Sequence, residues 1–120
     1  MFELTITTDF AAAHRLREYE GACENLHGHN YKVDVVLQSD RLNNLGMVMD
    51  FKAIKAALAE VTDRLDHAFL NDVDPFDKIN PTAENIAKHI CEGLAERLPG
   101  VGVKHVTVWE SDRCAATYVP

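Results

Sequence analysis

The chain is poor in cysteine and has no long apolar run. Its 120 residues include three cysteines, an odd number at wide spacing, which argues against a disulfide framework and favours reduced thiols. No apolar stretch approaches the roughly 20 residues that a transmembrane helix needs, and no apolar segment typical of a signal peptide opens the chain. We therefore expect a soluble, cytoplasmic protein that makes no membrane contact.

Basic residues are also in the minority. There are 12 lysines and arginines against 19 aspartates and glutamates, which gives a formal net charge of −7. Because nucleic-acid backbones are bound by clustered Lys and Arg, this balance argues against a nucleic-acid partner. A small anionic substrate would need only a local basic patch, for which Arg15, Lys32 and Lys52 are candidates by charge alone.

The sequence contains no internal repeat, no low-complexity tract and no linker-like stretch. With an apolar fraction of 47%, a chain of this length can bury one hydrophobic core. Residues 1–120 are therefore predicted to form a single domain.

Two runs near the N-terminus alternate apolar and polar residues with the period of two that is typical of half-buried strands. The first covers residues 2–10 and the second covers residues 31–37. The C-terminal segment 103–118 holds two further β-rich runs joined at "ESDR". This pattern is consistent with a closing hairpin.

Helical spacing of apolar residues predicts two helices between these strand pairs. The first begins after a capping Asp50 and carries an apolar stripe that ends at Leu65. The second begins after Thr82, which follows Pro81 and can act as its cap, and it ends near Leu98. The resulting order is ββααββ, an α+β fold in which two helices cover one face of an antiparallel four-stranded sheet. Such a sheet keeps a bare face and open edges, which oligomerisation would cover.

The stretch "CENLHGHNYKVDVVL" places two histidines at the start of the second strand. Residues i and i+2 of a strand project from the same face with Cα atoms roughly 6.5 Å apart, so His27 and His29 can converge on one ion. His14, at the end of the preceding strand, can supply a third nitrogen if the two strands pair. Three neutral imidazoles suit Zn²⁺ and leave a fourth position open, as in catalytic zinc sites. The alternative is an ordinary polar role at a strand end or on a helix, which is how we interpret His89 and His105.

Five motifs follow one another along the chain: "AAAHRL", "CENLHGHNY", "LDHAFLND", "NPTAENIA" and "VWE". In this order they resemble the 6-pyruvoyltetrahydropterin synthase family, which includes the queuosine-pathway 6-carboxytetrahydropterin synthases. The resemblance implies the tunnelling fold (T-fold), in which ββααββ subunits join their sheets into a barrel, usually as a trimer or as a hexamer of two stacked trimers. It also implies active sites between subunits, with zinc bound by His14, His27 and His29.

The resemblance further implies which residues transfer protons and bind the substrate. Cys23 matches the family's catalytic base, and Asp66 and His67 match its acid/base pair. Glu110 matches a glutamate that accepts hydrogen bonds from the pterin ring, and Thr82 matches a residue that lines the pterin pocket. Judged from the residues alone, each has a plainer interpretation as a buried thiol, a helix end, a charge at a hairpin edge or a helix cap.

The implied reaction converts 7,8-dihydroneopterin triphosphate into 6-carboxy-5,6,7,8-tetrahydropterin, with release of triphosphate and acetaldehyde. The spacing C-x3-H-G-H resembles bacterial carboxy enzymes, whereas animal pyruvoyl synthases have a longer interval between cysteine and "HGH". Because "HGHNYKV" and "GMVM" look equally like the animal enzymes, a 6-pyruvoyltetrahydropterin synthase, which keeps the side chain, is the alternative. A zinc- or pterin-binding module without turnover is the third interpretation, for which the histidines would matter and Cys23 would not.

Overall fold

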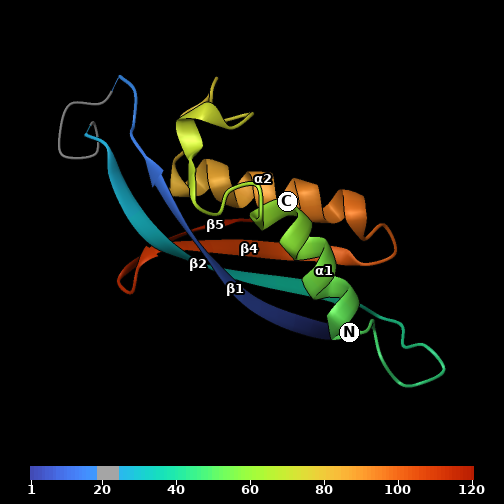
Figure 1. Ribbon diagram of the computed structural model, residues 1–120. Coiled ribbons are helices and arrows are strands. Elements are labelled where there is room, and N and C mark those ends of the chain that lie inside the picture. The colour runs from blue at the N-terminus through green and yellow to red at the C-terminus, as the bar shows by residue number, and fades with distance from the viewer. Residues whose placement is uncertain (19–24) are drawn as a thin grey trace.

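The computed structural model describes residues 1–18 and 25–120 of the chain (Figure 1). Within this part, two long strands are followed by a helix, a very short strand, a 3₁₀ turn, a second helix and a closing pair of strands. The elements are β1 Phe2–His14, β2 His27–Ser39, α1 Phe51–Thr62, β3 Ala68–Phe69, η2 Leu70–Asp72, α2 Ala83–Arg97, β4 Gly102–Ser111 and β5 Cys114–Tyr118.

β1 and β2 pair along their whole length as antiparallel strands. The register starts at Phe2 and ends with His14 opposite His27. Phe10 and Tyr31 belong to the buried face, and their rings stack with centroids 4.9 Å apart. Because the apolar residues of both strands follow a period of two, this register buries them together on one face.

The sheet has five strands in the described part of the chain, in the order β3-β1-β2-β4-β5, which is one strand more than predicted. The additional strand, β3, pairs in parallel with Ala12 and Ala13 at the edge of β1. A strand of two residues has no period that a sequence pattern can detect. The other strand pairs are antiparallel, as expected.

α1 begins where it was predicted and ends earlier. Asp50 caps its N-terminus, because the Asp50 side chain accepts a hydrogen bond from the backbone N–H of Lys52. The prediction that this helix continues to Leu65 is wrong, because α1 ends at Thr62. The backbone N–H groups of Leu65 and Asp66 both donate to the carbonyl of Thr62, so the chain turns there and buries Leu65 without a continuous helix.

α2 follows the sequence pattern. The Thr82 hydroxyl accepts a hydrogen bond from the backbone N–H of Asn85, and the helix ends immediately before Leu98. α2 packs on β4 and β5, while α1 packs on β1 and on α2. Both helices lie on the same face of the sheet, as Figure 1 shows, so the predicted layering is confirmed. Across residues 1–18 and 25–120, no helix is long and apolar enough to cross a membrane.

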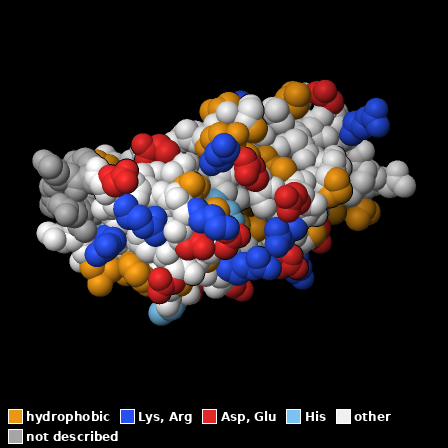
Figure 2. All heavy atoms as spheres, turned by 90° about the horizontal axis from the view of Figure 1, so that it is seen from above, with side chains coloured by type: hydrophobic (Ala, Val, Ile, Leu, Met, Phe, Trp, Pro, Cys, Tyr) orange, Lys and Arg blue, Asp and Glu red, His pale blue; other side chains and the backbone are white. Residues whose placement is uncertain are grey.

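The face of the sheet away from the helices carries a polar network. Thr7 donates to Asp34 Oδ1 at 2.8 Å, and Trp109 Nε1 donates to Asp34 Oδ2 at 3.0 Å. Lys32 lies over the Trp109 ring, with Nζ 5.7 Å from the ring centroid. Figure 2 views the molecule from above, from the side of the helices, and there basic and acidic side chains are interspersed rather than gathered into areas of one sign.

We predict that Leu94→Ala lowers the free energy of unfolding by about 2–5 kcal/mol, because it removes apolar contacts and leaves a cavity. Leu94 is 0% exposed, whereas Leu45, in the loop before α1, is 80% exposed. Leu45→Ala is therefore the matched control and should change the same free energy by less than about 0.5 kcal/mol. Urea denaturation at one protein concentration measures both variants, and equal effects would contradict this placement of the core.

Candidate functional site

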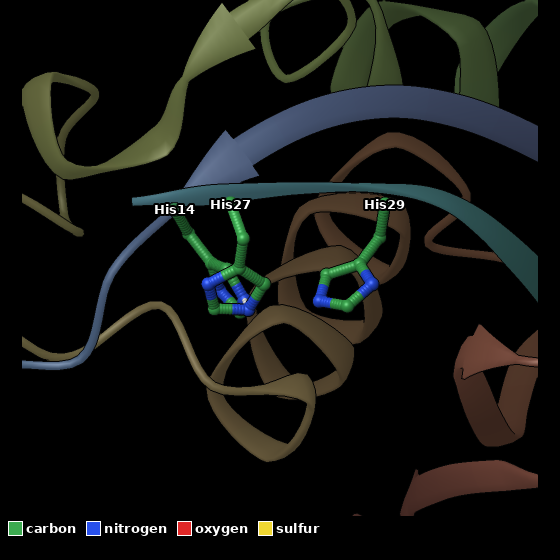
Figure 3. Close-up of side chains that lie close together, drawn as sticks. All are labelled: His14, His27 and His29. Carbon is green, nitrogen blue, oxygen red and sulfur yellow. Dashed lines mark hydrogen bonds between the residues drawn. The ribbon is translucent and has the colours of Figure 1, made fainter. Parts of the chain in front are cut away.

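Three histidines converge where β1 ends and β2 begins (Figure 3). His14 lies opposite His27, and His29 projects from the same face of β2 two residues later. One ring nitrogen of each lies within 4.8 Å of the others. The structure therefore brings together the three residues that the sequence predicts as metal ligands.

The backbone around the cluster determines which ring nitrogen of two of these histidines faces inward. His14 Nδ1 lies 2.6 Å from the carbonyl oxygen of Pro81, and His27 Nδ1 lies 2.7 Å from that of Asn25. Because a carbonyl oxygen can only accept, we infer that both Nδ1 atoms carry a proton and donate it. Both Nε2 atoms then hold a lone pair, and these two atoms are 3.0 Å apart.

Two facing lone pairs repel each other unless a cation or a proton lies between them. His29 adds a third nitrogen, since its Nε2 is buried and has no hydrogen-bond partner among the described residues. In a tetrahedral zinc site with Zn–N distances of about 2.0–2.1 Å, ligand nitrogens lie about 3.3–3.4 Å from one another. The 3.0 Å separation of the His14 and His27 nitrogens is close to this value. The residues present therefore fit a zinc ion.

His14 is almost fully buried, at 1% exposure. Burial lowers the pKa of His14; the hydrogen bond to the Pro81 carbonyl raises it in part, and the neighbouring His27 lowers it again. The lowered pKa favours the neutral imidazole, which is the form that binds a metal. The Pro81 carbonyl also orients the ring, as the outer partners of metal-binding histidines commonly do.

Tyr31 and Glu110 extend the site along the same face of the sheet. The strand pairing of β2 with β4 ends at Lys32 and Trp109, and the charge of Glu110, the next residue of β4, acts on both Tyr31 and His14. The buried Tyr31 ring lies 5.3 Å from the His29 ring between centroids, and its hydroxyl finds no partner in the described part of the chain. Burial, and then the charge of Glu110, raise the pKa of Tyr31, so the phenol keeps its proton. The sequence pattern treats Tyr31 as an apolar-face residue, although its spacing of two from His29 already places it beside the cluster.

Glu110 borders a hollow of about 190 Å³ between the start of α2 and β5. The hollow is also lined by Ala83, Glu84, Cys114, Ala115 and Ala116. Thr82 lies next to the hollow in sequence, and its hydroxyl is engaged by the backbone N–H of Asn85. The structure therefore places Thr82 as a helix cap at the edge of this hollow.

The Asp66 carboxylate binds both His67 and the edge of β1. Its Oδ1 accepts a hydrogen bond from the backbone N–H of Ala11 at 2.9 Å, and its Oδ2 lies 3.0 Å from His67 Nδ1. The Ala11 hydrogen bond is the main cause that lowers the pKa of Asp66, with His67 contributing less. The predicted pair is thus in contact, but the helix end predicted beside it is wrong. Since α1 ends at Thr62, its dipole does not reach His67.

Within one chain, this pair lies at the edge of β1, beside β3. His67 has a left-handed backbone, with φ of +57°, and its side chain is 82% exposed. It borders an open groove of about 520 Å³ whose lining includes Ala11, Ala13, Gly28 and Asn30 and also the cluster residue His29. Ala11, Ala13 and Asn30 alternate along their strands with the predicted ligand histidines, so their side chains point away from the helices. The structure therefore does not bring all the predicted site residues together in a single chain.

Comparison with known proteins shows the family of this chain. A family model described as 6-pyruvoyl tetrahydropterin synthase matches residues 3–120. The chain belongs to this family. A 6-carboxy-5,6,7,8-tetrahydropterin synthase of Synechocystis sp. is 44% identical over 115 residues, which cover 91% of this chain and 86% of that protein. A dihydroneopterin monophosphate aldolase of Pyrococcus furiosus is 38% identical over 104 residues, covering 86% of this chain and 84% of that protein.

The fold agrees with the family. The solved structure of Caenorhabditis elegans 6-pyruvoyl tetrahydropterin synthase matches with a TM-score of 0.89 at 30% identity, covering 99% of this chain and 95% of that chain. The α+β class and the T-fold predicted from the motifs are therefore confirmed, with the small β3 strand as the one addition.

The other residues singled out in the sequence do not belong to the histidine cluster where the structure describes them. Cys23 lies outside the described residues, so its role stays a prediction. The candidate basic residues lie on different elements: Lys32 is on β2, Lys52 is in the first turn of α1, and Arg15 borders a hollow of about 450 Å³ directly after β1. The His89 ring packs on Phe76 with centroids 5.3 Å apart, which agrees with a structural role.

We predict that Tyr31→Phe leaves the free energy of unfolding of the metal-free protein unchanged or raises it by up to about 1 kcal/mol, since the hydroxyl has no bond to lose. This hydroxyl is buried and unpartnered within residues 1–18 and 25–120. Tyr31→Ala, which also removes the ring stacked on Phe10, should cost about 3–5 kcal/mol. Denaturant titration compares the two variants. A clear loss of stability in Tyr31→Phe would show that the hydroxyl is hydrogen-bonded after all.

Proposed function

We propose that the chain is a zinc-dependent 6-carboxy-5,6,7,8-tetrahydropterin synthase of the queuosine and 7-deazapurine pathway. Its substrate would be 7,8-dihydroneopterin triphosphate. With one water, this compound yields 6-carboxy-5,6,7,8-tetrahydropterin, triphosphate and acetaldehyde. The observation that carries the proposal is the convergence of three imidazoles, two of them with inward lone pairs, in a chain that is 44% identical to a relative of that name.

The residues around the cluster supply binding and orientation. A zinc ion held by His14, His27 and His29 would act as a Lewis acid toward oxygens of the substrate side chain. Glu110 would accept hydrogen bonds from the pterin ring N–H and the exocyclic amino group, a geometry that suits a carboxylate. The Tyr31 hydroxyl lies near the histidine cluster and Glu110, and it is available to donate a hydrogen bond to a polar atom of the substrate. An unpaired buried hydroxyl costs about 1–3 kcal/mol, so a ligand that accepts its hydrogen bond is favoured. Thr82 would border the pterin from the start of α2.

Proton transfer would be carried out by Cys23 and by the Asp66–His67 pair. The Cys23 thiolate removes a proton from the substrate side chain, as the resemblance to the family implies. Asp66 holds His67 through Nδ1, which leaves Nε2 to exchange a proton with the substrate. Because the exposed His67 is not among the residues that converge in the cluster of its own chain, a second copy would bring this pair to the metal. We therefore infer a trimer, or a hexamer of two trimers, with active sites shared between subunits.

A second candidate is 6-pyruvoyltetrahydropterin synthase activity, in which triphosphate is eliminated and the side chain is kept. The high structural similarity to the Caenorhabditis elegans protein favours it. The name of the Pyrococcus furiosus relative indicates cleavage of a monophosphate substrate, so the phosphorylation state of the substrate is part of the test. The remaining candidate is a zinc- or pterin-binding module without turnover.

Product identification tests the proposed reaction. We predict that purified, zinc-loaded protein converts 7,8-dihydroneopterin triphosphate to 6-carboxy-5,6,7,8-tetrahydropterin and an equal amount of acetaldehyde, measured by mass spectrometry and a coupled dehydrogenase assay. Cys23→Ala should retain zinc and form no product, because the base is lost while the ligands are intact. Accumulation of 6-pyruvoyltetrahydropterin without acetaldehyde would establish the second candidate. Turnover of the monophosphate alone would establish the aldolase reaction.

We predict that His29→Ala loses zinc while the chain stays folded, because one of three ligand nitrogens is removed. His105→Ala is the matched control, since His105 lies on β4 and is not one of the three histidines that converge. Elemental analysis after dialysis should give about one zinc per chain for the control and far less for His29→Ala. Full zinc occupancy in His29→Ala would refute the ligand assignment.

A further inference from the structure

Beyond the end of β1, the backbone N–H and C=O groups no longer pair with a neighbouring strand in the described part of the chain. Side chains form hydrogen bonds with them instead. On one edge, pairing with β2 ends at His14 opposite His27. On the other edge, β3 accompanies β1 at Ala12 and Ala13. Arg15 and Arg17, which follow His14, nevertheless make hydrogen bonds with the segment between β3 and α2.

Two asparagines take the place of a strand along this edge. Asn71 accepts a hydrogen bond from the Arg15 backbone N–H at 2.9 Å and donates one to the Arg15 carbonyl at 2.9 Å. Asn80 makes the same pair of bonds to Arg17, at 2.9 and 3.0 Å. In an extended strand, the N–H and C=O groups of alternate residues point to the same edge. The two side-chain amides therefore continue the ladder that β3 begins, and we call them the asparagine clip.

The clip is itself fixed to the rest of the fold. Asn71 is 7% exposed, and its backbone carbonyl accepts a hydrogen bond from the Arg17 guanidinium at 3.2 Å. The Asn80 carbonyl accepts a hydrogen bond from the Asn85 side chain of α2 at 2.8 Å. The clip thus connects the end of β1 to the first turn of α2.

His14 is the residue on which these contacts converge. Its neighbour Ala13 pairs with β3, its other neighbour Arg15 is held by Asn71, and its ring donates to the carbonyl of Pro81, the residue after Asn80. Both the backbone and the ring of His14 are therefore fixed by the same segment of chain. A displacement of this segment would move the His14 Nε2 away from the other two ligand nitrogens.

We propose that Asn71 and Asn80 are positioning residues that set the metal affinity of the histidine cluster by holding His14 in its ligand geometry. The inference rests on the metal site proposed above. It also accounts for the asparagines of two motifs, "LDHAFLND" and "NPTAENIA", to which the proposed reaction gives no part. The competing account is a purely structural clip, whose loss would lower stability and leave metal affinity unchanged.

The test is the metal affinity of full-length Asn71→Ala and Asn80→Ala. Chelator competition gives the dissociation constant for Zn²⁺, and the absorption spectrum of the Co²⁺ form reports the geometry of the site. Each substitution is expected to raise the Zn²⁺ dissociation constant about 10-fold or more, the range found when the outer partners of metal ligands are removed. The Co²⁺ spectrum should change in parallel.

Asn43→Ala is the matched control. The Asn43 side chain also accepts two backbone hydrogen bonds, from Leu45 and Met47. Asn43 lies in the loop after β2, at the opposite end of that strand from His27. This variant is expected to lower the melting temperature as the other two do, with an unchanged Zn²⁺ dissociation constant, which separates positioning from general destabilisation.

Wild-type affinity in folded Asn71→Ala and Asn80→Ala would overturn the clip proposal alone. Equal weakening in Asn43→Ala would also overturn it, because metal loss would then follow stability. If the buried Asn71→Ala does not fold, the decision rests on Asn80→Ala and on Asn85→Ala, which removes the support of the Asn80 carbonyl and should weaken binding to a smaller extent. A wild-type chain that binds no metal would refute the proposed metal site itself.

Discussion

The register of β1 against β2 is the constraint on which the candidate site depends. Side chains alternate between the two faces of a strand, so a slip of one residue in β2 would turn His27 and His29 away from His14. The stack of Phe10 on Tyr31 belongs to the same register and lies on the same face. The core and the candidate metal centre are therefore specified by one set of strand pairs, and a substitution that shifts the register would damage both.

The segment between β3 and α2 also helps to position the histidine cluster. It supplies the Pro81 carbonyl that orients His14, and the capping Thr82 follows directly. With Nδ1 committed to Pro81, the buried His14 ring satisfies its second nitrogen only if a cation or proton meets it. The predicted acid/base pair, Asp66 and His67, lies at the edge of β1. The residues proposed for the active site are thus not all gathered in one cluster within a chain. This agrees with the proposed sharing between subunits and with the sheet edges at β3 and β5, which no further strand covers in the described part of the chain.

The features that could be predicted from the sequence are local ones. Strand alternation, the caps Asp50 and Thr82, and the spacing of His27 and His29 each depend on a few neighbouring residues. The features that were missed depend on distant contacts. β3 exists because Ala68 reaches Ala12, and the Pro81 carbonyl meets a histidine 67 residues earlier in the chain. The early end of α1 and the outward-facing His67 follow from the turn after Thr62, which no periodicity reveals. The motif resemblance predicted roles for Asp66 and Glu110. Where each of these residues lies relative to the sheet could be learned only from the folded structure.

The central claim is that three histidines bind one zinc ion through inward-facing Nε2 atoms. Its most direct test is a crystal structure of the zinc-loaded protein, with diffraction recorded on both sides of the zinc absorption edge. The account predicts one anomalous peak per chain, about 2.0–2.1 Å from the Nε2 atoms of His14, His27 and His29. A peak at another site, or zinc bound through the Nδ1 atom of His14 or His27, would contradict it.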